Sequence, residues 1–75
     1  MVSVVHPVKG RKYLTKIENG KVWYRELLTH YNIVDGYIFN VIDIKDLGEQ
    51  IMAITLTNEK YIIDKVPEGS IVCLP

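Results

Sequence analysis

Apolar runs separated by short polar turn segments dominate the pattern along this chain. The clearest runs are GYIFNVIDI (36–44), QIMAITL (50–56) and KYIID (60–64). They are rich in β-branched and aromatic residues, which favour extended backbone because their side chains pack well on a pleated surface. Several short strands with regular punctuation are typical of a small barrel or sandwich.

Turn signals recur at short intervals, at KG (9–10), NG (19–20), DG (35–36), LGE (47–49), NE (58–59) and PEG (67–69). The strongest is Asn19-Gly20, because a two-residue type I′ turn needs positive φ at both central positions and both residue types can adopt it. This turn predicts an antiparallel hairpin that includes a strand over residues 21–25.

The second half of the chain predicts three consecutive antiparallel strands between residues 37 and 65. The segment ITLTNEKYII predicts the second reversal, with Ile54 opposite Ile63 and Leu56 opposite Tyr61 on one face. The other face of that hairpin would carry polar side chains suited to water, those of Thr55, Thr57, Lys60 and Asp64.

One segment conflicts with the β pattern. Apolar side chains recur there at helical spacing, at Trp23, Leu27, Leu28 and Tyr31, and RELLTHY contains good helix formers. We therefore expect one short helical turn near residues 26–31.

The order of two segments resembles the layout of an SH3-like barrel. DGYIFNVID (35–43) lies where such barrels place their second strand, and VPEGSIVCLP (66–75) resembles their short turn and closing strand. The resemblance covers residues 34–75 and concerns layout alone. The peptide-binding tyrosines and paired tryptophans of that family have no matching positions, so its proline-rich ligand does not carry over. The sequence thus predicts one mainly β domain over residues 1–75, a small five- to six-stranded SH3-like barrel or roll.

The Asn19-Gly20 hairpin determines which side chains share a face. A two-residue loop pairs Lys16 with Trp23 and Leu14 with Arg25 across the hairpin. Successive strand residues point to opposite faces, so the core face would carry Tyr13, Thr15, Ile17, Val22 and Tyr24. The other face would carry Lys12, Leu14, Lys16, Glu18, Lys21, Trp23 and Arg25.

Trp23 would then lie among cations, where an exposed indole can anchor an interface or stack on a base. Two alternatives remain open. The stems of Lys16 and Arg25 could cover Trp23 merely to shield it. A three-residue loop with a bulge could instead turn Trp23 inward.

Charge and size narrow the classes of function. The formal net charge of the 75 residues is zero. However, residues 1–30 hold six basic and two acidic side chains (+4), and residues 31–75 hold three and seven (−4). Zero net charge argues against strong nonspecific nucleic-acid binding, and the small size argues against a deep enzyme pocket. A single cysteine excludes an internal disulfide, and we expect a soluble cytoplasmic protein without a signal peptide.

The sequence gives little support for a catalytic site or a metal-binding site. His6, His30 and Cys73 lie far apart in sequence and lack metal-ligand spacing, so no metal or cofactor is expected. Asp43 and Asp64 could approach one another across adjacent strands as a carboxylate or Mg²⁺ site. Solvated strand faces and turns explain these carboxylates better, and we expect no enzymatic activity.

The leading expectation is a non-enzymatic module that binds a partner protein through one hairpin face, with Trp23, Arg25, Lys16, Leu14, Lys21 and Lys12 as contacts. Size and composition suggest a phage-encoded protein that modulates a host protein. Edge strands rich in Val and Ile make homodimerisation by strand pairing a further expectation. The alternative is a single-stranded nucleic-acid binder that stacks bases on Trp23, Tyr13 or Tyr37.

Overall fold

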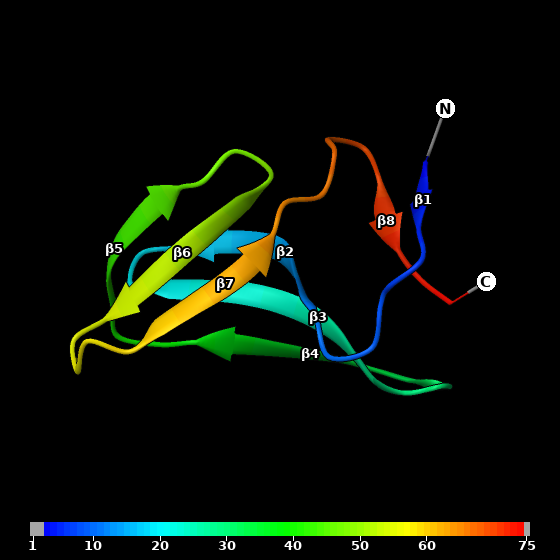
Figure 1. Ribbon diagram of the computed structural model, residues 1–75, viewed down its shortest axis with the longest axis horizontal. Coiled ribbons are helices and arrows are strands. Elements are labelled where there is room, and N and C mark those ends of the chain that lie inside the picture. The colour runs from blue at the N-terminus through cyan, green and yellow to red at the C-terminus, as the bar shows by residue number, and fades with distance from the viewer. Residues whose placement is uncertain (1–2, 75) are drawn as a thin grey trace.

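The computed structural model describes residues 3–74, which form eight strands in two sheets (Figure 1). The large sheet has the spatial order β4–β3–β2–β7–β6–β5. Its strands are β2 (Lys12–Glu18), β3 (Lys21–Thr29), β4 (Asn32–Ile38), β5 (Val41–Asp46), β6 (Gln50–Thr55) and β7 (Lys60–Asp64). The small sheet pairs β1 (Val4–Val5) with β8 (Ile71–Val72). The mainly β prediction is confirmed for this part of the chain, while residues 1, 2 and 75 of the predicted domain lie outside it.

The large sheet curls strongly because of one short connection. Phe39 and Asn40 alone join β4 to β5, although these strands are the opposite edges of the sheet. Asn40 turns the corner in the left-handed region with a φ of 56°, which Asn tolerates better than most residues. The amide of Val41 then donates to the carbonyl of Gly20 at 3.1 Å. No ladder joins β4 to β5 within residues 3–74, so the curled sheet is not a closed barrel.

The main core lies inside the curl. Its buried cluster combines residues from both halves of the sheet, namely Val22, Ile38, Ile51, Ala53 and Ile63, with Leu14, Tyr24, Val41 and Tyr61 packed against it. The alternation of the pleat is clear on β7, where Ile63 is fully buried and its neighbour Ile62 is 46% exposed.

β6 and β7 form the predicted antiparallel hairpin, but the predicted register is wrong. Ile63 pairs with Ile51 rather than with Ile54, and Tyr61 pairs with Ala53 rather than with Leu56. The observed partners are three residues away from the predicted ones. Because side chains alternate with a period of two, a shift by three residues exchanges the core face and the solvent face of β6.

A wider loop between β6 and β7 causes this shift. The amide of Thr55 donates to the carbonyl of Glu59 at 2.9 Å, and Asn58 takes a φ of 65°. The loop therefore begins earlier than the predicted turn. As a result Thr55, predicted to face water, is buried, and Leu56 is 69% exposed.

The helical turn predicted near residues 26–31 is also wrong, since residues 3–74 contain no helix. β3 continues to Thr29, residues 30 and 31 form the turn to β4, and Leu28 forms a bulge in the pairing of β3 with β4. Leu27 is buried and Leu28 is exposed, as neighbouring residues of a strand are when only one face is covered. Pairing with β4, and with β2 at Glu26, outweighs the local helix propensity. With no helix in the described part, no membrane-spanning helix is found there either.

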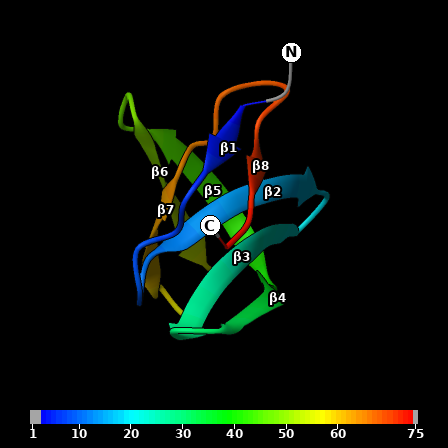
Figure 2. The same cartoon turned by 90° about the vertical axis from the view of Figure 1, so that its right-hand side faces the viewer.

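The small sheet lies across the outer side of β2 and β3 (Figure 2). The amide of Ile71 donates to the carbonyl of Ser3 at 2.9 Å, and the hydroxyl of Tyr13 accepts from the amide of Val8 at 2.8 Å. Tyr13 and Val72 are both buried. The closing strand predicted within residues 66–75 thus exists as β8, but it pairs with β1 rather than with the large sheet.

Candidate functional site

The Asn19-Gly20 turn has the predicted length. Glu18 pairs with Lys21, and Lys16 pairs with Trp23. Of the two central residues only Gly20 has positive φ, at 77°, so the turn is not of the predicted type I′. The register nevertheless places Trp23 on the face opposite to the main core, and the alternative of a three-residue loop is excluded.

A bulge at Thr15 changes the faces further along β2. Leu14, rather than Thr15, pairs with Tyr24, because the register shifts by one residue between Leu14 and Lys16. Leu14 therefore packs against the main core, and Lys12 Nζ lies 5.2 Å from the centroid of the Tyr24 ring on the same face. The predicted placement of Lys12 and Leu14 beside Trp23 is wrong, since one inserted residue exchanges the two faces.

The predicted core face of β2 changes for the same reason. Tyr13 is buried, but it lies on the outer face, where it is paired with Arg25 and contacts the N-terminal segment. Thr15 is exposed, and Ile17 is 51% exposed at the end of the hairpin. Sequence alternation alone could not locate the bulge.

Three aromatic rings lie in a row on the outer face of β3, β4 and the connection that follows β4. Tyr37 pairs directly with Trp23 across the two strands, and their ring centroids are 4.7 Å apart. Phe39 follows two residues later, with its ring centroid 6.4 Å from that of Tyr37. Trp23 is half-buried, whereas Tyr37 and Phe39 are 46% and 62% exposed.

Two lysines lie over these rings. Lys16 Nζ is 6.0 Å from the centroid of the Trp23 ring, and Lys21 Nζ is 4.9 Å from that of Tyr37. Both distances allow a cation–π attraction. Lys16 also pairs with Glu18 and lowers the pKa of that carboxyl group. The nearby indole N–H of Trp23 lowers the pKa of Glu18 as well. Its Nε1 is buried, and within the described residues it makes no hydrogen bond of good geometry.

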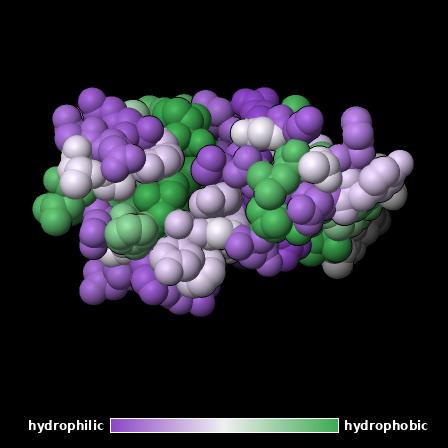
Figure 3. Space-filling view, turned by 90° about the horizontal axis from the view of Figure 1, so that it is seen from below, coloured by the Kyte–Doolittle hydropathy of each residue, from purple (hydrophilic) through white to green (hydrophobic). Residues whose placement is uncertain are grey.

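We call Lys16, Lys21, Trp23, Tyr37 and Phe39 together the aromatic–lysine surface. Exposed apolar side chains also form other patches, separated by hydrophilic residues (Figure 3), so exposure alone does not single out a site. No family model, curated protein or solved structure matches this chain. What distinguishes this surface is that three neighbouring aromatic rings lie together with two lysines over them. Phe39 was missed from the sequence, although its i, i+2 spacing from Tyr37 was a usable signal.

Arg25, also predicted as a partner contact, is held by two groups of the protein itself. Its Nε and Nη2 donate to the two carboxylate oxygens of Asp35 at 2.8 and 3.2 Å, and its Nη1 donates to the carbonyl of Val72 at 3.0 Å. The hydrogen bonds raise the pKa of Arg25 and lower that of Asp35. Because Asp35 titrates lower when folded, the pair adds stability above about pH 4, and this is lost as the pH falls through the folded-state pKa.

Arg25→Gln is expected to loosen β8, since it removes the bidentate pair and weakens the donor to Val72. The partly buried thiol of Cys73 reports on this change, because its amide donates to Val5 within the same small sheet. Labelling of Cys73 by a thiol reagent under native conditions should become several-fold faster. Lys12→Gln is the matched control, as it breaks a 3.5 Å ion pair with Glu26 on the other face. Equal labelling rates in wild type and Arg25→Gln would contradict the anchoring role.

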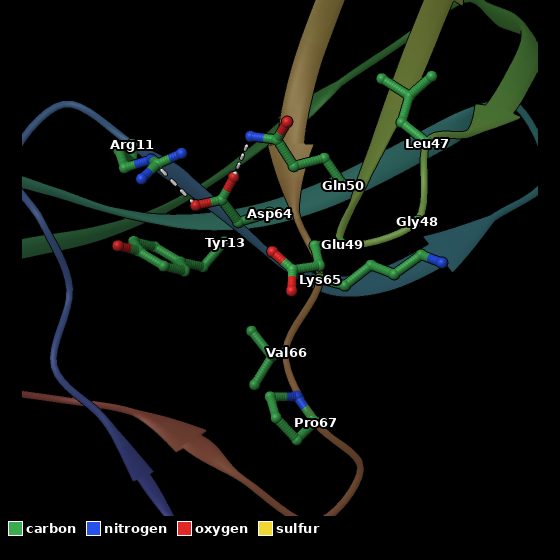
Figure 4. A pocket seen from close by; sticks show the side chains of 10 residues that line it. All are labelled: Arg11, Tyr13, Leu47, Gly48, Glu49, Gln50, Asp64, Lys65, Val66 and Pro67. Carbon is green, nitrogen blue, oxygen red and sulfur yellow. Dashed lines mark hydrogen bonds and ion pairs between the residues drawn. The ribbon is translucent and has the colours of Figure 1, made fainter.

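An open hollow of about 770 Å³ lies near the β5–β6 turn and the end of β7 (Figure 4). Asp64 is its central carboxylate. One oxygen lies 3.0 Å from Nε of Arg11, and the other accepts from Nε2 of Gln50 at 2.7 Å. Since both oxygens are engaged, Asp64 is poorly placed to act as a free base.

The alternative in which Asp43 approaches Asp64 across adjacent strands does not occur. Asp43 lies on β5 and Asp64 on β7, and β6 separates the two strands. Within residues 3–74, no three His, Cys, Asp or Glu side chains gather as a metal site would require.

Proposed function

We propose that this protein is a non-enzymatic interaction module that binds a partner protein through the aromatic–lysine surface. The observation that carries the proposal is a row of aromatic rings in contact, those of Trp23, Tyr37 and Phe39. Lysine side chains lie over two of these rings. Of the six contacts predicted from the sequence, Trp23, Lys16 and Lys21 remain in the proposal. Arg25 supports the surface from beside it.

The geometry of the row favours binding. Trp23 and Tyr37 lie on paired strands, so the backbone holds their rings in place before a partner arrives. Rings that are ordered in advance lose little conformational entropy on association. Aromatic side chains are also the residue types most enriched at the energetic centre of protein interfaces. Phe39 and Tyr37 offer the accessible contact area, and Trp23 packs against the ring of Tyr37.

Charge favours a protein partner over a nucleic acid. Lys16 lies beside Glu18 and Arg25 lies beside Asp35, so each of these cations already has a carboxylate neighbour. Within residues 3–74 Lys21 forms no ion pair. Such a surface would release few counterions from a phosphate backbone, and counterion release supplies most nonspecific nucleic-acid affinity. A partner with an apolar groove and a weakly acidic rim fits better.

Single-stranded nucleic acid remains the second candidate, supported by the cation–π pair of Lys21 with the exposed ring of Tyr37. Tyr13, one of the expected stacking residues, is buried with its hydroxyl accepting a backbone hydrogen bond, so it offers no ring to a base. Stacking would rely on Tyr37 and Phe39.

Three finer expectations from the sequence stay within the proposal. An SH3-like layout is supported by the short antiparallel strands and the tight corner between β4 and β5. Cytoplasmic location and an origin as a phage-encoded modulator rest on size and composition alone.

The test compares Phe39→Ser with Tyr31→Ser. Phe39 belongs to the surface, and Tyr31 is an aromatic residue 88% exposed in the β3–β4 turn, outside it. Partners captured from an extract of the source organism are identified, and their affinity for purified variants is then measured by calorimetry. Phe39→Ser should weaken binding about tenfold or more, as loss of an aromatic anchor does, whereas Tyr31→Ser should not.

Two results would count against the proposal. Equal affinity of wild type and Phe39→Ser would remove the surface as the binding site. Recovery of nucleic acid with no protein, and a complex that weakens steeply from low to physiological salt, would favour the second candidate.

A further inference from the structure

We propose that the chain forms a two-fold symmetric homodimer by antiparallel pairing of β5 with β5 of a second copy, centred on Ile44. β5 is an edge of the large sheet, and residues 42–46 are all exposed. The dimer would use a different part of the molecule from the aromatic–lysine surface. It therefore does not depend on the proposed function.

The backbone of β5 directs hydrogen-bonding groups away from β6 in the required pattern. The amide of Leu47 donates to the carbonyl of Gln50 at 2.8 Å, which continues the pairing of Asp46 with Ile51. Hydrogen-bonded and non-hydrogen-bonded pairs alternate along an antiparallel ladder. The polar backbone groups of Ile44 therefore point away from β6. In agreement, the Ile44 amide donates to the side chain of Asp43 at 2.9 Å rather than to β6.

A two-fold axis through Ile44 makes the strand complementary to itself. It places Ile44 opposite Ile44 of the second copy as a hydrogen-bonded pair. Asp43 then lies opposite Lys45 of the second copy, and Lys45 lies opposite its Asp43. Both side chains are on the same face of β5, because they are two residues apart. Within residues 3–74 neither forms an ion pair, so both are available for the two reciprocal ones.

Pairing would also cover apolar area. Ile44 is 36% exposed, and Ile42 and Leu47 near it are 63% and 50% exposed. Asp43 would exchange its bond to the Ile44 amide for an ion pair with Lys45 of the second copy, while that amide would bind the opposite strand. The contact is short, so the dimer should be concentration-dependent rather than obligate.

The other edge of the large sheet is a poorer match for itself. The single charged residue of β4 is Asp35, and it is held by Arg25. Self-pairing there would offer no cation to meet a carboxylate. Charged residues and the bulge at Ile42 protect β5 from foreign strands, as is usual for an edge. The spacing of Asp43 and Lys45 makes a second copy the matching partner.

Charge reversal and exchange test this register. Sedimentation velocity of the full chain is measured from about 1 µM to about 1 mM, which spans weak dimers. The wild type should shift from monomer to dimer as its concentration rises. Lys45→Asp and Asp43→Lys each set like charges opposite one another twice, and each should raise the dimer Kd about tenfold. The double exchange Asp43→Lys/Lys45→Asp keeps the composition and should restore the wild-type Kd within about threefold.

Lys9→Asp is the control for net charge, since Lys9 is exposed outside β5, and Phe39→Ser should dimerise like the wild type. Thermal unfolding of each variant verifies the fold. A wild type that stays monomeric throughout would overturn the proposal. So would single reversals that leave the dimer intact, or a folded double exchange that fails to restore it.

Discussion

Replacement of Ile63 by Ala is expected to lower the free energy of unfolding by about 2–5 kcal/mol, whereas Ile62→Ala should lower it by less than about 1 kcal/mol. Ile63 is fully buried in the main core among residues of β3, β4 and β6, so its loss leaves a cavity. Ile62 is its neighbour on the same strand, has the same side chain and is 46% exposed. Urea denaturation followed by the fluorescence of Trp23, the single Trp, measures both values.

The difference matters because the domain is small. A chain of this length has only about 5 kcal/mol or a little more of stability, so Ile63→Ala should leave a substantial unfolded fraction. Similar losses at the two positions would mean that β7 does not have the observed orientation. If Ile63→Ala is too unstable to purify, Ile63→Val, with an expected loss of about 0.5–1.5 kcal/mol, replaces it.

Gly36→Ala is expected to destabilise the fold by about 1–3 kcal/mol through overpacking. Gly36 on β4 lies directly opposite Tyr24 on β3, and the Tyr24 ring covers it. A Cβ at position 36 would lie 2.7 Å from the hydroxyl oxygen of Tyr24 and 2.8 Å from its Cζ. The ring cannot move aside freely, because Tyr24 also packs against the main core.

A double-mutant cycle isolates this contact. In the Tyr24→Ala background the ring is absent, so Gly36→Ala should be close to neutral, or stabilising by about 0.5–1 kcal/mol as in an ordinary strand. The free energies of unfolding of the four proteins give the coupling. An equal cost of Gly36→Ala in both backgrounds would show that the close approach to Tyr24 does not govern this position.

Local signals in the sequence predicted those features that depend on a few neighbouring residues. Asn19-Gly20 predicts the length of its turn and the pairing of Lys16 with Trp23, and the structure confirms both. The turn type differs, yet two-residue loops of different types preserve the same pairing. The predicted strands near residues 50–56 and 60–64 are also present.

Predictions that extended a register beyond a turn were less successful. Thr15 inserts one residue into β2, and the β6–β7 loop shifts its hairpin by three. Because side chains alternate with a period of two, each odd shift reverses the faces, which moved Leu14 to the core and Leu56 to solvent. Neither shift has a signal in the alternation itself, since both arise from how several strands fit together.

By itself the sequence determined that this chain forms short strands separated by turns, since β-branched residues and turn formers act over a few neighbouring positions. Only the tertiary structure decided that β2 lies beside β7, that Arg25 reaches Val72 across 47 positions, and that Tyr37 and Phe39 join Trp23. The physical reason is that burying one common core selects the strand order and the bulges together. That choice, made over the whole chain, determines which side chains remain on the surface.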